Sequence, residues 1–250
     1  MELLKMKAET RLKGLVEVSV VFPAYNEADA LEAAVEKVTK ALNEFALSYE
    51  IIVAEDGSTD GTDKLAAALA EKYSFVKHIH GEKRLGRGTA LKNAFKQSNG
   101  EVLVYMDLDI ATDLKHLKSL VGAVEFEGYD FATGSRMLPK SIAQRSGTRH
   151  IASKTYNFMV RALLGSKVKD HQCGFKAFRR EPLIKLLDEV DAGHWFWDTE
   201  ILVRAYLSGY KIKEIPVSWR GGRETKVKLL KDSLNMGWQA FLLWWRLKVQ

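Results

Sequence analysis

The sequence predicts an α/β fold in which helices flank a mainly parallel central sheet, followed by a C-terminal amphipathic helical segment. Apolar runs rich in β-branched and aromatic residues recur along the chain, at 16–22, 49–54, 75–79, 102–106 and 131–133. Helical patterns rich in Ala, Leu, Glu and Lys separate the first four runs, an alternation that is typical of βαβ units. Near-continuous apolar strands indicate a sheet that helices cover on both faces.

Length, charge and cysteine content restrict the function without choosing one. With 250 residues, 46% of them hydrophobic, the chain can bury the core of one large domain. Its formal net charge of +6 is compatible with a nucleic acid, an anionic membrane or a phosphate-rich substrate. Because Cys173 is the only cysteine, we expect neither a disulfide framework nor a cysteine-based zinc site, as suits a reducing, cytoplasmic location.

The first two strands end in loops that carry carboxylates, P-A-Y-N-E at 23–27 and E-D-G-S-T-D-G-T at 55–62. Ligands of parallel sheets bind beyond the carboxyl ends of the strands, so these loops are candidates for a binding cleft. A turn followed by a helix N-cap would explain Ser58 or Asp60 equally well. It would not explain the acidic pair Glu55 and Asp56 directly at the end of a buried strand.

The loops after the next two strands carry motifs that differ in how specifically they indicate a function. K-R-L-G-R-G at 83–88 precedes a helix and could approach an anion, but such loops are common and this one lacks the Walker lysine spacing. After the fourth strand, Asp107 and Asp109 flank Leu108, and alternation places both carboxylates on one side, where they can share a divalent cation. An isolated D-x-D is more often a solvated turn. Its position after the fourth strand of a βα series favours a metal site.

The second half carries helical patterns at 150–164 and 199–207 with a loop near Gly174, and no linker or repeat divides the chain. The apolar stretch at 234–247 is shorter than the roughly 20 residues of a spanning helix. A helix over this stretch would either lie in a membrane interface or pack on the domain's own core, and both interpretations stay open. Along this tail, the basic residues Arg220, Arg223, Lys226, Lys228 and Lys231 precede the bulky residues Trp238, Phe241, Leu242, Leu243, Trp244 and Trp245.

Together these motifs resemble family 2 glycosyltransferases of the GT-A fold, a Rossmann-like architecture. P-A-Y-N-E, E-D-G-S-T-D-G-T, G-R-G-T-A-L and D-L-D occur in that family's order and approximate spacing, and the resemblance continues through G-S-R at 134–136, D-H-Q-C-G-F-K at 170–176 and W-D-T-E at 197–200. We therefore expect a single GT-A domain over 1–225, with a nucleotide half at about 16–112 and an acceptor half at about 130–225, and a helical segment over 226–250.

Within the family, the second-half motifs are similar to polyprenyl-phosphate sugar synthases, especially the dolichyl-phosphate glucose synthases. Mannose synthases commonly place Gln two residues after the second metal-binding Asp, whereas this chain has Ala111 followed by Thr112. The resemblance implies transfer of a hexose, first of all glucose from UDP-glucose, to a polyprenyl or dolichyl phosphate. Mannose from GDP-mannose, or another UDP-sugar, stays open.

The resemblance also implies roles for particular residues. Those expected to bind the nucleotide sugar are Pro23, Ala24, Tyr25, Glu27, Asp56, Arg87, Asp107, Arg223 and Lys226. Asp107 and Asp109 would hold Mg²⁺ or Mn²⁺, and Arg136, Arg149 and Ser153 would bind the acceptor phosphate. Asp198 would be catalytic together with Arg136 and Arg149, although an N-cap would also explain Asp198 and a solvated helix charge would also explain Arg149.

The implied reaction needs cations more than a strong base. A lipid monophosphate is already an anion at cytoplasmic pH, because the second pKa of an alkyl phosphate is about 6. Bringing it beside a diphosphate requires positive charge on both, which arginines and a metal supply. In-line attack at the anomeric carbon would convert an α-linked donor into a β-linked product. We expect a peripheral protein at the cytoplasmic face of a membrane, and homo-oligomers are compatible with the sequence.

Three other functions match parts of the chain. A processive polysaccharide synthase should carry a Q-x-x-R-W segment and transmembrane helices, and a sugar nucleotidyltransferase should carry a Gly-rich N-terminal loop with Arg and Lys; neither signature occurs in the sequence. A non-enzymatic nucleic-acid-binding module would suit the pI of about 9.2 and the Trp/Arg-rich tail. It would leave the ordered acidic motifs unexplained.

Overall fold

The strands form one large sheet and one small one. The computed structural model describes residues 16–46, 48–144, 147–221 and 229–249, the side chains of 229–234 excepted. In this part of the chain, a seven-stranded sheet has the order β3-β2-β1-β4-β7-β5-β8, and β6 pairs with β9. The strands are β1 (Val18–Ala24), β2 (Tyr49–Glu55), β3 (Val76–Ile79), β4 (Val102–Met106), β5 (Phe131–Ser135), β6 (Ile142–Gln144), β7 (Phe175–Arg179), β8 (Ile212–Pro216) and β9 (Ser218–Arg220).

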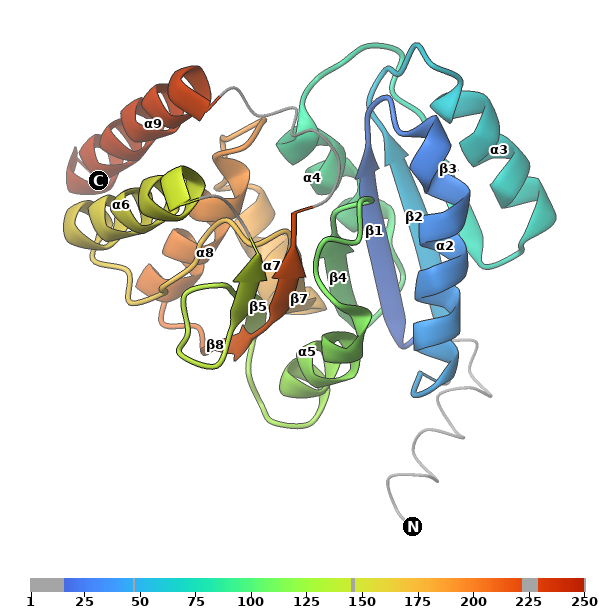
Figure 1. Ribbon diagram of the computed structural model, residues 1–250, viewed down its shortest axis with the longest axis horizontal. Coiled ribbons are helices and arrows are strands. Elements are labelled where there is room, and N and C mark those ends of the chain that lie inside the picture. Colours follow the sequence, from blue (N-terminus) through green and yellow to red (C-terminus); the bar gives the residue numbers. More distant parts are fainter. Residues whose placement is uncertain (1–15, 47, 145–146, 222–228, 250) are drawn as a thin grey trace.

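Helices cover both faces of the large sheet (Figure 1). One face packs against α2, α3 and α5, and the other against α4, α7 and α8, while α6 and α9 lie side by side beyond α8. The helices are α2 (Ala28–Asn43), α3 (Thr62–Lys72), α4 (Arg87–Gln97), the 3₁₀ turn η1 (Leu114–His116), α5 (Leu117–Glu125), α6 (Gly147–Leu164), α7 (Arg180–Leu187), α8 (Trp197–Leu207) and α9 (Leu229–Val249).

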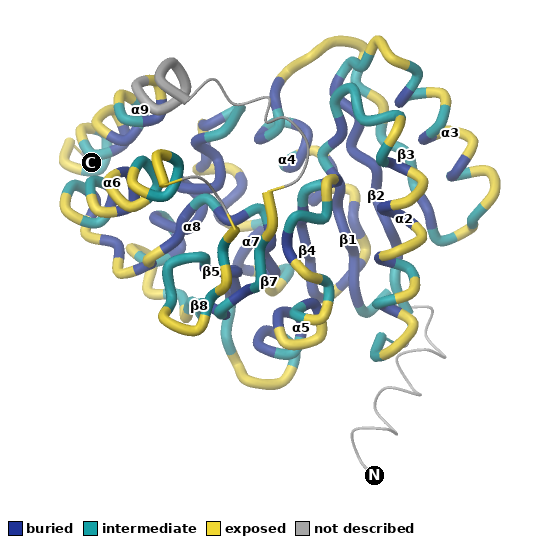
Figure 2. Tube along the Cα trace, in the orientation of Figure 1, coloured by how far each residue is buried: buried dark blue, intermediate teal, exposed yellow. Residues whose placement is uncertain are grey.

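The sheet forms the buried centre of the molecule (Figure 2). Alternate residues of β1 face opposite helical layers, as the pleat requires. Val20 and Phe22 lie on the side of α2, Val21 lies on the side of α4, and all three are fully buried. Burial on both faces explains why the strands read as continuous apolar runs, and the predicted α/β architecture with a mainly parallel sheet is confirmed.

The sequence did not predict β7, which lies between β4 and β5 and runs antiparallel to both. The loop expected near Gly174 leads directly into this strand. Lys176 interrupts the apolar pattern of β7, although its side chain is completely buried. The strand joins β4 of the first half to β5 of the second, so the two halves share one sheet.

The C-terminal helix α9 has two apolar faces. Met236, Ala240 and Leu243 are buried in the core cluster that also contains residues of α6 and α8. Trp238 and Trp245 are exposed at 59% and 57%. One face therefore packs on the domain, as one of the two expectations held, and the other faces outward. Among the described helices, none combines the length and apolarity that crossing a bilayer requires.

Candidate active site

The first wall of the candidate site forms where β1 and β2 end. These strands pair in parallel with Ala24 opposite Glu55, and the amide of Asp56 donates to the carbonyl of Ala24 across 2.9 Å. The predicted nucleotide residues Pro23, Ala24, Tyr25 and Asp56 therefore gather at one edge of the sheet, and Glu27 follows as the residue before α2. This is the edge at which parallel sheets bind ligands.

Asp56 fastens the loop after β3 to this edge. Its buried carboxylate accepts hydrogen bonds from the amides of Leu85 and Gly86, at 2.7 and 2.9 Å. Gly57 has a φ of +69°, and a Cβ on it would lie 2.6 Å from the amide nitrogen of Arg84, so only glycine allows the two loops to approach. The guanidinium of Arg84 lies 3.8 Å from the centre of the Tyr25 ring, a cation–π contact.

The two glycines of the segment 83–88 allow it to pack closely against the segment before α8. The amides of Gly88 and Thr89, at the start of α4, donate to the carbonyl of Gly193 at 2.9 and 3.2 Å. A Cβ on Gly88 would lie 2.5 Å from the carbonyl oxygen of Ala192. The glycine therefore lets α4 touch the segment before α8, and the helix N-terminus is satisfied by backbone.

Arg87 connects the two candidate acidic groups of the site. Its Nη2 donates to Asp107 Oδ1 at 2.6 Å and to the Tyr105 hydroxyl, and lies 3.8 Å from Asp198 Oδ2. The guanidinium also lies 5.0 Å from the Trp195 ring centre. Burial disfavours the charge, but Asp107, Tyr105 and Asp198 outweigh it, so the pKa of Arg87 lies above its usual range. Among the described residues, its buried Nε has no hydrogen-bond partner.

Asp107 and Asp109 fit a small divalent cation. Asp107 is half-buried and Asp109 is exposed, and both line a cavity of about 10 Å³, space for roughly one water or ion. Gly174 keeps this space open, because a Cβ there would lie 1.9 Å from Asp107 Oδ2. Directly after Asp109 the chain turns sharply, with Ile110 at a φ of +48°. Loss of surrounding water raises the pKa of Asp107 to about 6, although Arg87 opposes the rise.

Asp198 is held in a buried charged network. It lies at the start of α8 and is 4% exposed. Lys176 Nζ donates to its Oδ1 at 2.5 Å, and the Tyr105 hydroxyl donates to the carboxylate at 2.9 Å. Tyr105 and Lys176 are cross-strand neighbours in β4 and β7, which places both beside Asp198. The sequence-based site did not include Lys176 or Tyr105. A lysine inside the apolar run F-K-A-F was the signal that could have identified one of them.

Arg136, at the end of β5, forms a bidentate ion pair with Asp170. Its Nε and Nη2 donate to the two carboxylate oxygens at 2.7 and 2.9 Å, and its backbone amide adds a third bond at 2.9 Å. Burial alone would raise the pKa of Asp170, but Arg136 lowers it to about 2. The guanidinium also lies 5.6 Å from the Trp219 ring centre. Much of the bonding capacity of Arg136 is therefore committed within the protein.

The other predicted acceptor residues lie on α6. Arg149 and Ser153 are four residues apart and half-buried, so they share one face of the helix. Asn157, one turn further, accepts bonds from the backbone amide and Nδ1 of His171 at 2.9 and 2.8 Å, which fixes α6 to the 170–176 motif. The remaining predicted ligands, Arg223 and Lys226, lie outside the described residues.

Comparison with known proteins identifies the family of this sequence. The sequence model of glycosyl transferase family 2 matches residues 19–187. The chain is 48% identical over 237 residues to the glycosyltransferase AglD of Haloferax volcanii, covering 94% of this chain and 38% of AglD. It is 32% identical over 235 residues to the human dolichyl-phosphate beta-glucosyltransferase, covering 88% of this chain and 72% of that protein. The chain thus spans well under half of AglD.

Solved structures show the same architecture. Glucosyl-3-phosphoglycerate synthase from Mycobacterium tuberculosis, in complex with Mn²⁺, UDP-glucose and phosphoglyceric acid, matches with a TM-score of 0.71 and 22% identity over 95% of this chain and 82% of that one. The complex of the same enzyme with phosphoglyceric acid alone matches with a TM-score of 0.69 and 23% identity, covering 94% of this chain and 80% of that one. The GT-A fold expected from the motifs is therefore confirmed. The fold, the family match and the identity to curated glycosyltransferases lead to one conclusion: the chain belongs to glycosyl transferase family 2.

Proposed function

We propose that the protein is a metal-dependent, inverting glycosyltransferase that moves a hexose, first of all glucose from UDP-glucose, to a polyprenyl or dolichyl phosphate at a membrane surface. The observation that carries this proposal is the pair Asp107 and Asp109 at the edge of the sheet, beside Arg87 and the wall built on Asp56. Curated relatives from human, yeast and fly are dolichyl-phosphate beta-glucosyltransferases, which supports the acceptor class.

The donor side binds charge and orients the leaving group. Tyr25 and Asp56, with Pro23, Ala24 and Glu27, bind the base and ribose. Asp107 and Asp109 would hold Mg²⁺ or Mn²⁺, which would supply positive charge to neutralise the charge that develops on the departing diphosphate. Arg87, poised between Asp107 and Asp198, adds a cation next to the same group. Arg223 and Lys226 are proposed to close over the diphosphate.

The acceptor side positions a phosphate that needs no base. Arg149 and Ser153, on one face of α6, bind the phosphate oxygens, and Arg136 contributes while it is oriented by Asp170. Asp198 carries a salt bridge to Lys176, so we assign it to orientation of the reacting groups rather than proton removal. Attack by the phosphate oxygen on the anomeric carbon, opposite the diphosphate, inverts the configuration.

The membrane contact is assigned to the outward faces of α6 and α9. Phe158 on α6 and Trp238 and Trp245 on α9 are exposed at 66%, 59% and 57%. Lys154 and Lys248, on the same two helices, are exposed as well. Aromatic side chains flanked by lysines suit the interface of an anionic bilayer, and the phosphate end of a polyprenyl lipid lies at that depth. On this proposal, the protein acts as a peripheral protein at the cytoplasmic face of the membrane.

A donor panel tests the function directly. The protein is incubated with vesicles containing polyprenyl phosphate, Mg²⁺ or Mn²⁺, and UDP-glucose, another UDP-sugar or GDP-mannose in parallel. We expect a β-linked glucosyl phosphate lipid, identified by mass and by NMR of the anomeric proton, and no product in excess EDTA. Preferred use of GDP-mannose would replace the donor assignment. Full turnover in EDTA would remove the metal from the proposal.

A further inference from the structure

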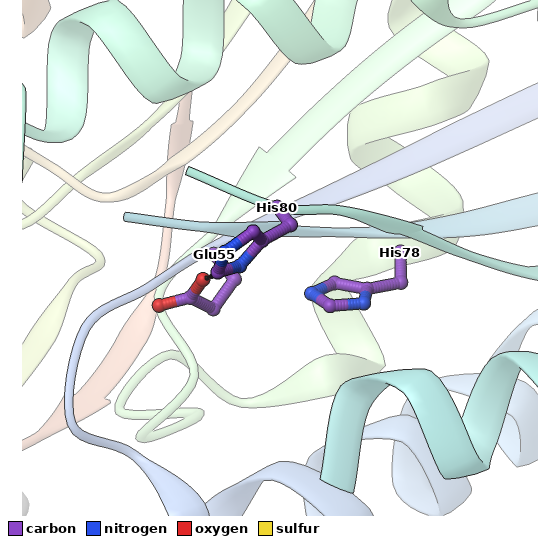
Figure 3. A group of neighbouring side chains, drawn as sticks. All are labelled: Glu55, His78 and His80. Atoms are coloured by element: carbon purple, nitrogen blue, oxygen red, sulfur yellow. Dashed lines mark hydrogen bonds and ion pairs between the residues drawn. The ribbon is translucent and has the colours of Figure 1, made fainter. Parts of the chain in front are cut away.

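Glu55, His78 and His80 bring three potential metal ligands together where β2 and β3 end. One ligand atom from each lies within 4.8 Å of the others, and Figure 3 shows the three side chains converging. The strands pair in parallel with Val53 opposite His78, so two residues further on His80 comes beside Glu55. Because side chains alternate along a strand, all three project from the same face of the sheet.

The polar atoms of this cluster are only partly satisfied by protein. The Glu55 side chain is completely buried; one of its oxygens accepts from the amide of Ser58, and the other lies 2.7 Å from Nδ1 of His80. The His78 ring is turned toward these groups (Figure 3), yet its buried Nε2 has no hydrogen-bond partner among the described residues. A buried polar atom without a partner requires an explanation. A metal ion would supply one by accepting the nitrogen lone pair.

We propose that Glu55, His78 and His80 form a second metal site, which takes Zn²⁺ or a similar transition-metal ion and is separate from the site at Asp107 and Asp109. Two imidazole nitrogens and one carboxylate oxygen are a donor set of zinc, whereas Mg²⁺ prefers oxygen alone. Ligands of tetrahedral zinc stand roughly 3.4 Å apart, so small movements of the two rings close the cluster around an ion.

Access and charge are both favourable to a bound ion. His80 is 51% exposed, so an ion can enter from solvent and keep a water as its fourth ligand. Burial lowers the pKa of His78, an effect that Glu55 opposes, and a neutral imidazole has the lone pair that coordination needs. The Glu55 carboxylate supplies negative charge in a fully buried position.

An ion here would cross-link the loops that build the first wall of the active site. Glu55 is adjacent to Asp56, whose carboxylate holds Leu85 and Gly86. The loop begins directly after His80, and Gly81 packs so closely that a Cβ on it would lie 3.0 Å from the Glu55 carbonyl oxygen. Joining His80 to Glu55 through a metal would therefore fix both ends of this loop. The role is structural support of the wall, not chemistry on a substrate.

Metal titration without any sugar donor tests the site. The protein is titrated with Zn²⁺, and with Co²⁺ as a spectroscopic probe, in excess Mg²⁺. We expect one tightly bound equivalent, intense visible bands of tetrahedral Co²⁺ and a rise in Tm. Glu55→Gln keeps an oxygen for the Ser58 amide, and His80→Ala removes a half-exposed ring, so both should fold. Each should lower zinc affinity by at least about 100-fold, since even outer-shell changes cost 10–100-fold.

Two variants serve as matched controls. Asp109→Asn alters the other candidate metal site, and His150→Ala removes a histidine from α6; both should bind Zn²⁺ like wild type. The proposal is overturned if wild type binds no Zn²⁺, if Glu55→Gln and His80→Ala bind it unchanged, or if only Asp109→Asn loses the Co²⁺ bands. Because no sugar transfer enters the readout, failure of the proposed transferase activity would leave this result unaffected.

Discussion

At the scale of single residues, two buried acids of the active site are each paired with a particular cation. Asp198 is paired with Lys176 at 2.5 Å, and Asp170 with Arg136 at 2.7 Å. Removing one partner of a buried pair leaves an uncompensated charge, which costs about 3–5 kcal/mol of stability. Loss of activity in such variants therefore mixes unfolding with chemistry. The informative substitutions are those at exposed or half-exposed positions.

Asp109 is such a position. Its carboxylate is exposed and accepts a local bond from the amide of Ala111 at 3.0 Å, so Asp109→Asn should change stability by less than about 0.5 kcal/mol. Turnover should fall by about two to three orders of magnitude, because several kcal/mol of charge stabilisation at the diphosphate is lost. Steady-state kinetics at saturating metal, with Tm in parallel, measure both effects. Unchanged kcat in a variant with native Tm would contradict the metal assignment.

Arg149 and Arg136 should behave differently when changed to alanine. Arg136→Ala leaves the buried Asp170 carboxylate without its cationic partner and should lower the free energy of unfolding by about 3–5 kcal/mol. Arg149→Ala, on the half-exposed face of α6, should fold normally and raise the KM for lipid phosphate by about 10-fold or more, with UDP affinity unchanged. Acceptor kinetics and UDP titration on both variants decide this. Native acceptor KM combined with weakened UDP binding would reverse the proposed division of labour.

At the scale of elements, the sequence predicted those whose signal is local. The apolar strands and the amphipathic helices of the first half could be predicted because period and turn chemistry lie within each segment. β7 could not, because its lysine is stabilised by Asp198 from a helix 22 residues away, a contact that no local pattern contains. The short β6 pairs with β9, and β9 also forms a bridge from Trp219 to Thr112, so both depend on segments far away in the sequence. Likewise, the motifs identified both Asp107 and Arg87 as site residues, but not the hydrogen bond between them.

The junction between α6 and the 170–176 motif predicts a pH dependence of stability. His171 is fully buried, bonded to Asn157 and Ser166, and burial lowers its pKa to about 3. Histidine in an unfolded chain has a pKa of about 6.5, so at pH values between the folded and the unfolded pKa the unfolded chain binds one more proton than the folded one. Stability should therefore fall on acidification, with His171 contributing up to about 1.4 kcal/mol per pH unit. Urea unfolding at pH 7, 6, 5 and 4 measures the slope.

Two variants check that this slope belongs to His171. His171→Gln removes the titrating ring and should flatten the dependence above about pH 4. Asn157→Asp places a carboxylate beside Nδ1 of His171, which should raise the pKa of His171 in the folded protein. The pH range over which stability depends on this residue should then become narrower. An identical slope in wild type and both variants would assign the acid sensitivity to other groups.

The outward face of α9 predicts salt-sensitive binding to anionic vesicles. Trp238→Glu/Trp245→Glu should weaken it by at least about 10-fold, because two exposed aromatic side chains and their burial in the interface are lost. Trp244 is half-buried and packs on the core, so it is the wrong residue to change. Vesicle sedimentation at low and high salt is the measurement. Asn235→Glu/Gln239→Glu adds the same charge to α9 without removing an aromatic ring, and should have a smaller effect.

At the scale of the whole molecule, the strand order joins the two halves in one sheet, so we expect them to unfold as one cooperative unit. β7 pairs with β4 on one side and β5 on the other, and the Gly193 carbonyl binds the start of α4. A first half expressed alone would expose the edge of β4, which β7 normally covers. Residues 16–112 should consequently fail to fold in isolation, although they carry most of the nucleotide-binding motifs.

Unfolding experiments can test whether the two halves unfold together, because all 6 tryptophans lie in the second half, from residue 195 to residue 245. Tryptophan fluorescence therefore reports on the second half, whereas far-ultraviolet circular dichroism reports on both. We expect coincident transitions in urea, as in two-state unfolding. Two separated transitions, with fluorescence changing in only one of them, would show that the halves unfold independently.

The contact between Arg87 and Asp107 also bears on the order in which ligands arrive. In the protein alone, Arg87 occupies one oxygen of Asp107 and so competes with any ion that seeks this carboxylate. In the proposed site, a nucleotide diphosphate would offer Arg87 another anion and would bring its own oxygens to the metal. Each ligand would thereby remove an obstacle to the other, and linkage would make the effect reciprocal. We therefore expect the apparent metal affinity to rise with the donor concentration, and the cleft to favour an ion that arrives already chelated by its nucleotide.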